Sequence, residues 1–522
     1  MKTPNTAKAT CAGCPLSRRR FLSTASAGAL GALAAGSILP ACGTAPKTRV
    51  RVVYALHDVV QPGPDWPNVG FDFRPVMERT TAVVGRALPG GEVLTSMAKG
   101  EEEAKKILAD DAAAPVDGYI VVQLNCWNRV AQTVAASGMP TLYVDFPYGG
   151  SGGFLVYTAA FLRRRTPNLG FVASSRPEDL AAACRAFPQV KRSGDANAFG
   201  SLVAAARRAA TPGPGDLSVA ADALVCLSAA DCLKAMKASK ILAVGGSWPG
   251  IAPAIREQMG IEVVDVPFAV VNDAWAAADK DEAAAVADRW AGAAARVEGV
   301  DRATLLTSAA MYLGQKAVLA KYGANAITIN CLGGFYGGHI HAYPCLGFHE
   351  LLNEGLVGAC ECDVRSAATM VTLTALTNGR PGYISDPVVD TAERRIIYAH
   401  CVASNRAFGP AGPANPYEIL THSEDRQGAS VRSLLPAGRM TTTVEVSPER
   451  KLFLFHRAKA VGNSPDDRAC RTKLVAEPVG DIEKLFGEWD EWGWHRVTVY
   501  GDLKEPVYAL ADALGWKVLE EA

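Results

Sequence analysis

The sequence predicts an α/β protein that ends in a β domain. Short apolar, β-branched segments alternate with helix-forming segments twice, over residues 49–162 and again over residues 168–331. Such alternation is typical of βαβ units and a mainly parallel sheet. From Gly382 onward the pattern changes to alternating strands separated by Pro and Gly turns, which favours an antiparallel sheet or barrel. We therefore expect two Rossmann-like parallel-sheet α/β domains followed by a C-terminal, mainly antiparallel, barrel-like β domain.

The first α/β region contains segments that match strand and helix patterns in turn. The expected strands are 50–56, 118–124 and 141–146, and the expected helices are 101–110 and 128–137. The glycine-rich run 149–153 is expected to be a flexible break. No Lys-Ser or Lys-Thr follows it, so a phosphate-binding loop is not expected there.

The same strand and helix patterns predict the elements of the second α/β region and of the β region. The expected strands are 171–173, 241–244, 262–266 and 326–331, with helices over 178–187, 273–296 and 301–322 and later strands over 441–446 and 451–455. The domain boundaries predicted from these changes are 1–42 for a signal segment, 43–165 and 166–345 for the two α/β domains, and 346–522 for the last domain.

The first 42 residues are typical of an export signal. Residues 17–22, Ser-Arg-Arg-Arg-Phe-Leu, resemble the twin-arginine signature. The apolar stretch 25–38 is too short and too rich in Gly to span a membrane. Residues 39–42, Leu-Pro-Ala-Cys, resemble a lipoprotein processing site, which makes Cys42 the expected lipidated residue; an ordinary signal with a chance Cys is the alternative. We expect a periplasmic or cell-surface protein that reaches the membrane only through this lipid.

Charge and cysteine content narrow the classes of partner. The formal net charge of the whole chain is 0, and the first 42 residues carry five basic and no acidic residues, so their removal leaves −5. There is no basic tail or stripe, and nucleic-acid binding is therefore not expected. Most cysteines beyond Cys42 are expected to be buried small hydrophobes. Cys226 and Cys232 are the candidate disulfide pair.

A carboxylate that follows an apolar run marks the expected site. Glu361 comes after the run 355–360, and Asp386 and His400 also lie in or at the edge of apolar runs. A lone buried charge is costly unless a metal, a cation or donors compensate it. Two carboxylates and an imidazole without an obvious Lys or Arg partner predict a divalent cation. Glu361 would stand at the carboxyl end of a strand, where open α/β sheets place their sites.

Each of these residues also has a structural interpretation. Asp363 precedes an amphipathic helical face and is best interpreted as the N-cap of that helix. Asp386 precedes a Pro and on its own would be a turn residue. His400 on its own would be a core histidine, and His495, which follows an aromatic run, a loop histidine.

Two other histidines form a competing pair. His339 and His341 are separated by one residue, so on an extended segment both would share a face. They follow the glycine-rich run 333–338, which is expected to be a mobile loop. Substrate contact is a better expectation for this pair than metal binding.

Several short motifs together resemble those of one family. These are Gly-Ala-Cys-Glu-Cys-Asp-Val at 358–364 with Thr-Met at 369–370, Ser-Asp-Pro at 385–387, Ala-His-Cys at 399–401, His-Ser-Glu at 422–424, Cys-Arg-Thr at 470–472 and Trp-His-Arg at 494–496. Over 327–522 the chain resembles the L-fucose isomerase/L-arabinose isomerase-like superfamily. Over the two α/β regions only the layout of elements agrees.

The resemblance implies a metal-dependent aldose–ketose isomerase that acts on a monosaccharide. Glu361, Asp386, His400 and His495 would bind Mn²⁺, or Fe²⁺ or Co²⁺, which suit carboxylate and imidazole ligands. Glu361 and Asp386 would also move the proton through an ene-diol. The resemblance further implies a homo-oligomer, a trimer or hexamer.

Weaker candidates for sugar contact are His339, His341, His422 and Arg432, together with Arg439; a solvated surface position is the alternative for the two arginines. Two other functions remain open at this point. One is a non-catalytic, lipid-anchored sugar-binding protein, and the other is a redox or hydrolytic enzyme that uses the same metal site. The carboxylate pair favours the isomerase, because a binding protein needs no acid/base couple around a metal.

Overall fold

Strand β1 (Arg49–Ala55) shows why helices cover both faces of the first sheet. Val50 and Val52 pack in one apolar core, whereas Val53 and Ala55 pack in another, because successive side chains of a strand point to opposite faces. The helices of the first core are α1 (Arg74–Ala87), α5 (Pro177–Cys184), α6 (Ala186–Ser193) and α7 (Phe199–Ala210), and those of the second are α2 (Glu101–Ala113), α3 (Val130–Ala135) and α4 (Ser151–Arg163).

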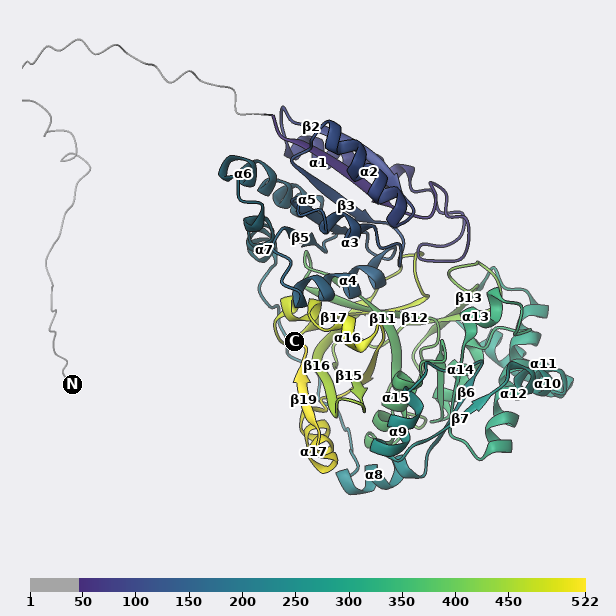
Figure 1. Ribbon diagram of the computed structural model, residues 1–522. Coiled ribbons are helices and arrows are strands. Elements are labelled where there is room, and N and C mark those ends of the chain that lie inside the picture. Colours follow the sequence, from purple (N-terminus) through teal and green to yellow (C-terminus); the bar gives the residue numbers. More distant parts are fainter. Residues whose placement is uncertain (1–46) are drawn as a thin grey trace, which may run out of the picture. The chain divides into compact units, whose positions relative to one another are not determined.

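The computed structural model describes residues 47–522 (Figure 1). The predicted export signal and the predicted lipidation at Cys42 fall outside this range and stay predictions. The first sheet is parallel, in the order β2 (Glu92–Ala98), β1, β3 (Gly118–Gln123), β4 (Thr141–Asp145) and β5 (Leu169–Val172). The strand expected over 171–173 in the second α/β region thus belongs to this first sheet.

The second sheet is also parallel. Its strands, in spatial order, are β10 (Val357–Cys360), β9 (Ala326–Ile329), β6 (Lys240–Val244) and β7 (Glu262–Val266). The helices of this region are α8 (Ala229–Lys237), α9 (Ile251–Met259), α10 (Phe268–Ala276), α11 (Lys280–Ala293), α12 (Arg302–Tyr322), α13 (Cys331–Tyr336), α14 (Cys345–Asn353) and α15 (Val364–Leu376). Because β10 is followed directly by α15, the edge of this sheet leads into the candidate site.

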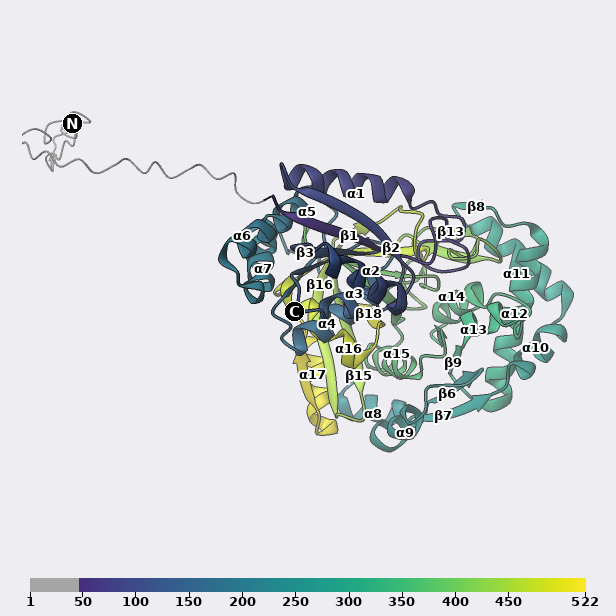
Figure 2. The ribbon, with the colours of Figure 1, turned by 45° about the horizontal axis from the view of Figure 1, so that its top comes forward.

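Six antiparallel strands close into a barrel. Their order is β15 (Met440–Ser447), β18 (Arg496–Tyr500), β11 (Tyr383–Asp390), β12 (Arg395–His400), β17 (Thr472–Pro478) and β16 (Leu452–Asn463), and β16 pairs back with β15. The last strand, β19 (Lys517–Glu520), joins β16 in parallel. Helix α4 and helix α15 both contact β11, and in Figures 1 and 2 the barrel lies between the two α/β regions.

Smaller elements complete the chain. A three-stranded sheet contains β14 (Ser430–Ser433), β13 (Tyr417–Leu420) and β8 (Arg296–Glu298), and the remaining helical elements are the 3-10 turns Ala196–Ala198 and Ile482–Phe486 with α16 (Trp489–Trp492) and α17 (Lys504–Leu514). Among residues 47–522, no helix combines the length and the apolar character needed to cross a membrane.

The predicted fold class is confirmed, since two parallel-sheet α/β regions precede an antiparallel barrel. Three local predictions are wrong. The single helix expected over 273–296 is two helices, because Asp279 caps the start of α11 with its side chain. The glycine-rich run 149–153, expected to be a break, enters α4, and the run 333–338, expected to be a loop, begins within α13. Cys226 and Cys232 are both free thiols.

Candidate metal centre

Four elements from two regions bring the candidate ligands together. Glu361 directly follows β10 of the second sheet, Asp386 lies in β11, His400 ends β12, and His495 immediately precedes β18. The first residue comes from the carboxyl end of a parallel sheet and the other three from the barrel. The site therefore forms where the second sheet meets the barrel.

The backbone is strained where Glu361 leaves its strand. Glu361 and Cys362 have φ values of 64° and 50°, in the left-handed region that costs a non-glycine residue roughly 1–2 kcal/mol. Two consecutive residues in this conformation turn the chain sharply between β10 and α15. Such strain persists when the surrounding structure fixes it, and it is common at functional sites.

The four side chains converge on one small volume. Glu361, Asp386, His400 and His495 each place one ligand atom within 4.8 Å of the others. Nε2 of His495 lies 3.3 Å from Oδ1 of Asp386 and 3.5 Å from Oε2 of Glu361, and Nε2 of His400 lies 3.8 Å from Oε1 of Glu361. Both imidazole Nε2 atoms are buried and have no hydrogen-bond partner. Two carboxylates and two orphaned ring nitrogens fit a divalent ion.

The charges of this cluster are strongly coupled. Burial raises the pKa of Glu361, and the neighbouring charge of Asp386 raises it further. Burial by itself would lower the pKa of His495, but the carboxylates of Asp386 and Glu361 raise it well above its ordinary value. A cation among these side chains would compensate the buried negative charge that otherwise makes the arrangement unfavourable.

Asp363 has two roles in this site. As predicted, it caps α15, accepting hydrogen bonds from the backbone N–H groups of Arg365 and Ser366. Its Oδ2 also lies 2.9 Å from Nδ1 of His495. Burial opposes ionisation of Asp363, but the hydrogen bond from His495 is among the contacts that lower its pKa to about 2. A carboxylate that holds the far nitrogen of a metal-binding imidazole is a common supporting contact.

A second buried carboxyl group extends this contact. Ser366 Oγ lies 2.8 Å from Oδ2 of Asp363 and 3.1 Å from Oε2 of Glu445. Burial, followed by the charge of Asp363, raises the pKa of Glu445 to about 8. Near pH 7 the Glu445 carboxyl is therefore mostly neutral, and the chain of contacts from Glu445 through Ser366 to Asp363 carries one buried negative charge rather than two.

The two imidazoles differ in the nitrogen that carries the proton. Because Asp363 accepts at Nδ1 of His495, the proton of the neutral ring is held there and Nε2 offers a lone pair toward the centre. Nδ1 of His400 instead accepts the backbone N–H of Cys401 at 2.9 Å, so the proton of neutral His400 sits on Nε2. The neutral ring of His495 therefore offers Nε2 to an ion, whereas the neutral ring of His400 carries its proton there. Because Asp386 and Glu361 raise the pKa of both imidazoles against the effect of burial, an ion would displace a proton from each ring.

The segment that carries His495 is fixed by a buried ion pair. Arg496 Nη1 donates to the carbonyl of His495 at 2.8 Å, and Arg496 Nη2 donates to Oε1 of Glu521 at 2.8 Å. Glu521 also contacts Nδ1 of His456 at 2.9 Å. Arg496 is 0% exposed and stacks on Trp489. The penultimate residue of the chain therefore helps to hold the His495 backbone in place.

A cavity of about 450 Å³ opens onto the cluster. Glu361 and Asp386 form part of its wall. Its aromatic lining is Trp66, Trp127, Tyr336 and Trp494, and its other titratable lining is His57, Asp65, Cys126 and Glu424. Trp494 Nε1 donates to Oε2 of Glu361 at 3.5 Å. A cavity of this size with many apolar and few polar groups is typical of a small-molecule site.

The weaker candidates from the sequence lie elsewhere. His339 stacks on Phe268 and His341 packs edge-on against Trp275, and neither residue lines the cavity. His422 is buried, with Nδ1 3.1 Å from Oδ1 of Asp425.

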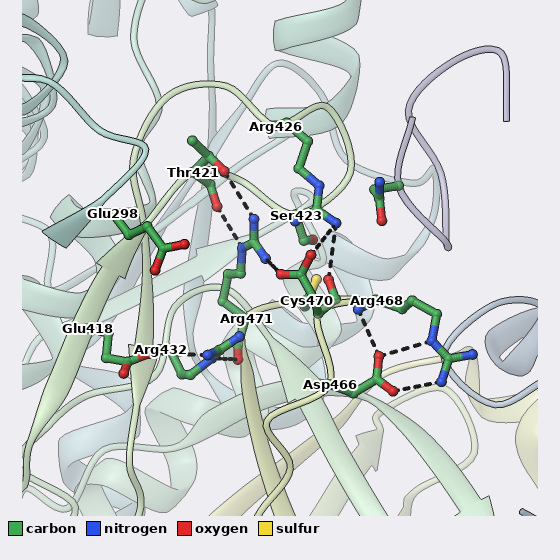
Figure 3. A network of polar contacts seen from close by, with 12 residues as sticks. Glu298, Glu418, Thr421, Ser423, Arg426, Arg432, Asp466, Arg468, Cys470 and Arg471 are labelled. Carbon is green, nitrogen blue, oxygen red and sulfur yellow. Dashed lines mark hydrogen bonds and ion pairs between the residues drawn. The ribbon is translucent and has the colours of Figure 1, made fainter. Parts of the chain in front are cut away.

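Arg432 belongs to a network of polar contacts near the end of the barrel. Its guanidinium donates to Glu418 and to the carbonyl of Arg471, and Arg471 in turn donates to Thr421 (Figure 3). Arg432 is 9% exposed, so the solvated position considered for it is wrong. Arg439 donates to the carbonyl of Ala221.

Sequence patterns missed three contributors to the site. Asp363 was expected only as a cap, because its contact with His495 spans 132 residues. Glu424 stands beside the predicted His422, and Tyr336 lies in the run expected to be a loop, yet both line the cavity. The His-Ser-Glu motif is the only signal that pointed toward Glu424.

Curated proteins that match part of this chain are named as sugar isomerases. No family model matches the sequence. The chain is 29% identical over 201 residues to a sulfoquinovose isomerase from Clostridium sp. (strain MSTE9), covering 37% of this chain and 43% of that protein. It is 26% identical over 224 residues to a sulfoquinovose isomerase from Alkalicoccus urumqiensis, covering 42% of this chain and 49% of that protein.

The solved structures that match this chain are less similar to it in sequence than the curated relatives are. A sugar ABC transporter (sugar-binding protein) from Bacillus halodurans is 12% identical and covers 66% of this chain and 90% of its own, but its TM-score of 0.18 is too low to support an inference. The chain spans somewhat less than half the length of the curated relatives it matches. Their names support the resemblance to sugar isomerases that the motifs predict.

Proposed function

We propose that this protein is a metal-dependent aldose–ketose isomerase that acts on a monosaccharide. The observation that carries the proposal is the convergence of Glu361, Asp386, His400 and His495 at the wall of one cavity. Similarity to proteins named sulfoquinovose isomerase supports the reaction class. That similarity does not identify the sugar, because it covers only part of each chain.

The proposed ion is Mn²⁺, with Fe²⁺ or Co²⁺ as chemically similar choices. Glu361, Asp386, His400 and His495 would hold it, with Asp363 orienting His495. When bound, such an ion supplies positive charge that stabilises the oxyanion of an ene-diolate. The side chains fit this task because both carboxylates reach the cavity wall while both imidazoles are buried behind it.

The cavity would exclude water from the reacting carbons and position the sugar ring. Trp66, Trp127 and Trp494 offer apolar faces, and Trp127 and Trp494 lie edge to face with ring centroids 5.5 Å apart. Carboxylates and the imidazole of His57 offer groups that bond to sugar hydroxyls. A few polar groups in an otherwise apolar wall orient a small ligand.

Metal analysis combined with solvent exchange tests the proposal. The purified protein is expected to hold about one Mn²⁺, Fe²⁺ or Co²⁺ per chain, and Glu361→Gln is expected to lose it. With metal and an aldose–ketose panel in D₂O, NMR should show deuterium entering C2 of one aldose. Glu393→Gln, at an exposed position, is the matched control and should keep both properties.

Two results would contradict the proposal. One is wild-type protein that holds no stoichiometric metal after loading. The other is metal-loaded protein that binds a sugar without exchange at any carbon, which would favour the non-catalytic binding role.

A further inference from the structure

We propose that a second cavity, in the first α/β region, binds a small organic anion that carries a phosphate, sulfonate or carboxylate group on an apolar body. This second cavity has a volume of about 630 Å³, and its wall includes Arg79, Val122, Asp145 and Arg468. It shares no lining residue with the cavity at the metal centre. The inference therefore goes beyond the proposed isomerase function and does not depend on it.

The second cavity lies at a position where α/β sheets commonly bind ligands. Its wall contains residues at the carboxyl ends of β3, β4 and β5, together with residues of α1 and α5, which contact each other on one face of the sheet. The loop that precedes β17 in the barrel supplies Asp466 and Arg468. Open α/β sheets place their ligands outside the carboxyl ends of their strands.

The part of the wall that the sheet supplies is largely apolar. Val122, Val144 and Val172 stand at or next to the last positions of β3, β4 and β5, and all three belong to the core beneath α1 and α5. Val76 and Val83 of α1 add to this surface. Covering apolar surface is favourable in proportion to the area removed from water. An organic body would cover these side chains, whereas a bare inorganic ion would not.

Two arginines of α1 supply positive charge without a carboxylate partner. Arg79 and Arg86 both line the second cavity and are seven residues apart, so they share a face of the helix. In the part of the chain that the structure describes, neither guanidinium forms an ion pair, whereas Arg176 in the same wall is paired with Asp179 at 3.1 Å. An oxyanion on the ligand would accept charge-assisted hydrogen bonds from them.

A third arginine of the wall is already held in position. Both oxygens of Asp466 bind Arg468, at 3.0 Å from Nε and 2.6 Å from Nη2 (Figure 3). The guanidinium lies 4.8 Å from the ring centre of Phe146. Lys473 fixes the loop by donating to the carbonyls of Asp466 and Cys470. Because these contacts order Arg468 before a ligand arrives, binding through its Nη1 costs little conformational entropy.

The carboxyl groups of the wall do not cancel this positive charge. Asp145 is 6% exposed, and burial raises its pKa to about 8, so it is mostly neutral near pH 7. The charge of Asp466 is offset by Arg468. The charges of Arg79 and Arg86 are therefore left for a ligand. The cavity at the metal centre, in contrast, is lined by carboxylates and by no Lys or Arg, so its wall would repel an anion.

Isothermal titration of the full-length, metal-loaded protein tests the inference. The anionic probes are phenyl phosphate, benzenesulfonate and benzoate, with benzyl alcohol as the neutral analogue and inorganic phosphate as the bare ion. At low ionic strength, at least one organic anion is expected to bind about tenfold or more tightly than benzyl alcohol and than inorganic phosphate. The anion with the highest affinity identifies the acidic group that the cavity takes.

Variants locate the binding. The double variant Arg79→Gln/Arg86→Gln should weaken binding of that anion by about tenfold or more. Arg185→Gln removes an exposed arginine of the same region that does not line the cavity, and it should bind as wild type does. Methyl NMR of valine-labelled protein should show shifts at Val76 and Val83 when the anion is added.

Three results would overturn the inference. They are organic anions that bind no more tightly than benzyl alcohol, inorganic phosphate that binds as tightly as the best organic anion, and equal affinities for wild type and the double variant. Metal-free protein should bind the anion as tightly as metal-loaded protein. Failure of this binding and failure of the proposed isomerase reaction are therefore separate results.

Discussion

Oδ2 of Asp363 lies 2.9 Å from Nδ1 of His495, although 132 residues separate them in the chain. The same carboxylate caps α15 through the N–H groups of Arg365 and Ser366. One side chain thus joins the start of a helix in the second α/β region to a histidine at the end of the barrel. The local capping role is visible in the sequence, whereas the contact with His495 exists only in the folded chain.

Asp363→Asn should weaken metal binding without unfolding α15. Asn caps helices about as well as Asp, but it cannot supply the negative charge that holds the proton of His495 at Nδ1. We expect the affinity for Mn²⁺ to fall by about 10- to 100-fold, as measured by competition with a chelator. Circular dichroism should show an unchanged helix content.

The control for this variant is Asp301→Asn. Asp301 caps α12 by accepting from the N–H of Thr304, so the same chemical change is made at a helix start that has no contact with the cluster. Its metal affinity should equal that of wild type. Equal affinities for the two variants would show that Asp363 acts only as a cap.

Substitution of the two imidazoles should have unequal effects. In its neutral form His495 has its proton held at Nδ1 by Asp363, so that Nε2 is free for an ion, whereas neutral His400 accepts from the N–H of Cys401 and carries its proton on Nε2. His495→Gln should therefore lower the Mn²⁺ affinity at least about tenfold more than His400→Gln. Both variants are titrated with Mn²⁺ at the same pH, so that each serves as the control for the other. Equal losses of Mn²⁺ affinity would contradict the predicted difference between the two imidazoles.

The sequence predicted the parts of the fold that depend on local patterns. Strand β7 was predicted to the residue, and the capping position of Asp363 followed from the amphipathic face of α15. Both depend on the order of neighbouring residues, because strand and helix periods bury different sets of side chains. The break between α10 and α11 was missed because Asp279 competes as a cap within an otherwise helical pattern.

The candidate site was only partly predictable. The residues Glu361, Asp386, His400 and His495 could be chosen from apolar runs and motif resemblance, and the fold brings them together. Sequence order gives no information on Arg496 and Glu521, whose contact crosses 25 residues and fixes the carbonyl of His495. Such supporting contacts depend on how the barrel closes, and barrel closure is a long-range property.

Glu521→Gln should destabilise the barrel strongly. The change leaves Arg496 buried without a charged partner, since Arg496 is 0% exposed and Glu521 is 1% exposed. Removing one partner of a buried pair costs about 3–5 kcal/mol of unfolding free energy. Urea unfolding of the metal-free protein measures this loss, and a weaker metal affinity should accompany it because Arg496 holds the His495 carbonyl.

The neighbouring residue provides the control. Glu520 pairs with Lys504 on the surface, with both side chains more than 40% exposed. Glu520→Gln should therefore change the unfolding free energy by less than about 1 kcal/mol. Similar losses for Glu520→Gln and Glu521→Gln would contradict a special role for the buried pair.

Asp145 at the end of β4 should make stability depend on pH. Burial raises the pKa of Asp145 to about 8, against the hydrogen bond from Ser151, whereas an unfolded Asp titrates near about 3.9. Between these values the folded chain holds one more proton than the unfolded chain. The stabilising contribution is complete below about pH 4 and is lost as pH rises through about 8, with a slope of at most about 1.4 kcal/mol per pH unit.

Asp145→Asn removes this titration while keeping an uncharged group of the same shape beside Ser151. The metal-site groups titrate equally in both proteins, so their contribution cancels in the comparison. Urea unfolding series between about pH 5 and pH 8 should therefore show a shallower fall in unfolding free energy for Asp145→Asn than for wild type. Parallel curves would mean that Asp145 is already ionised in the folded protein, and that Ser151 and nearby cations such as Arg468 outweigh its burial.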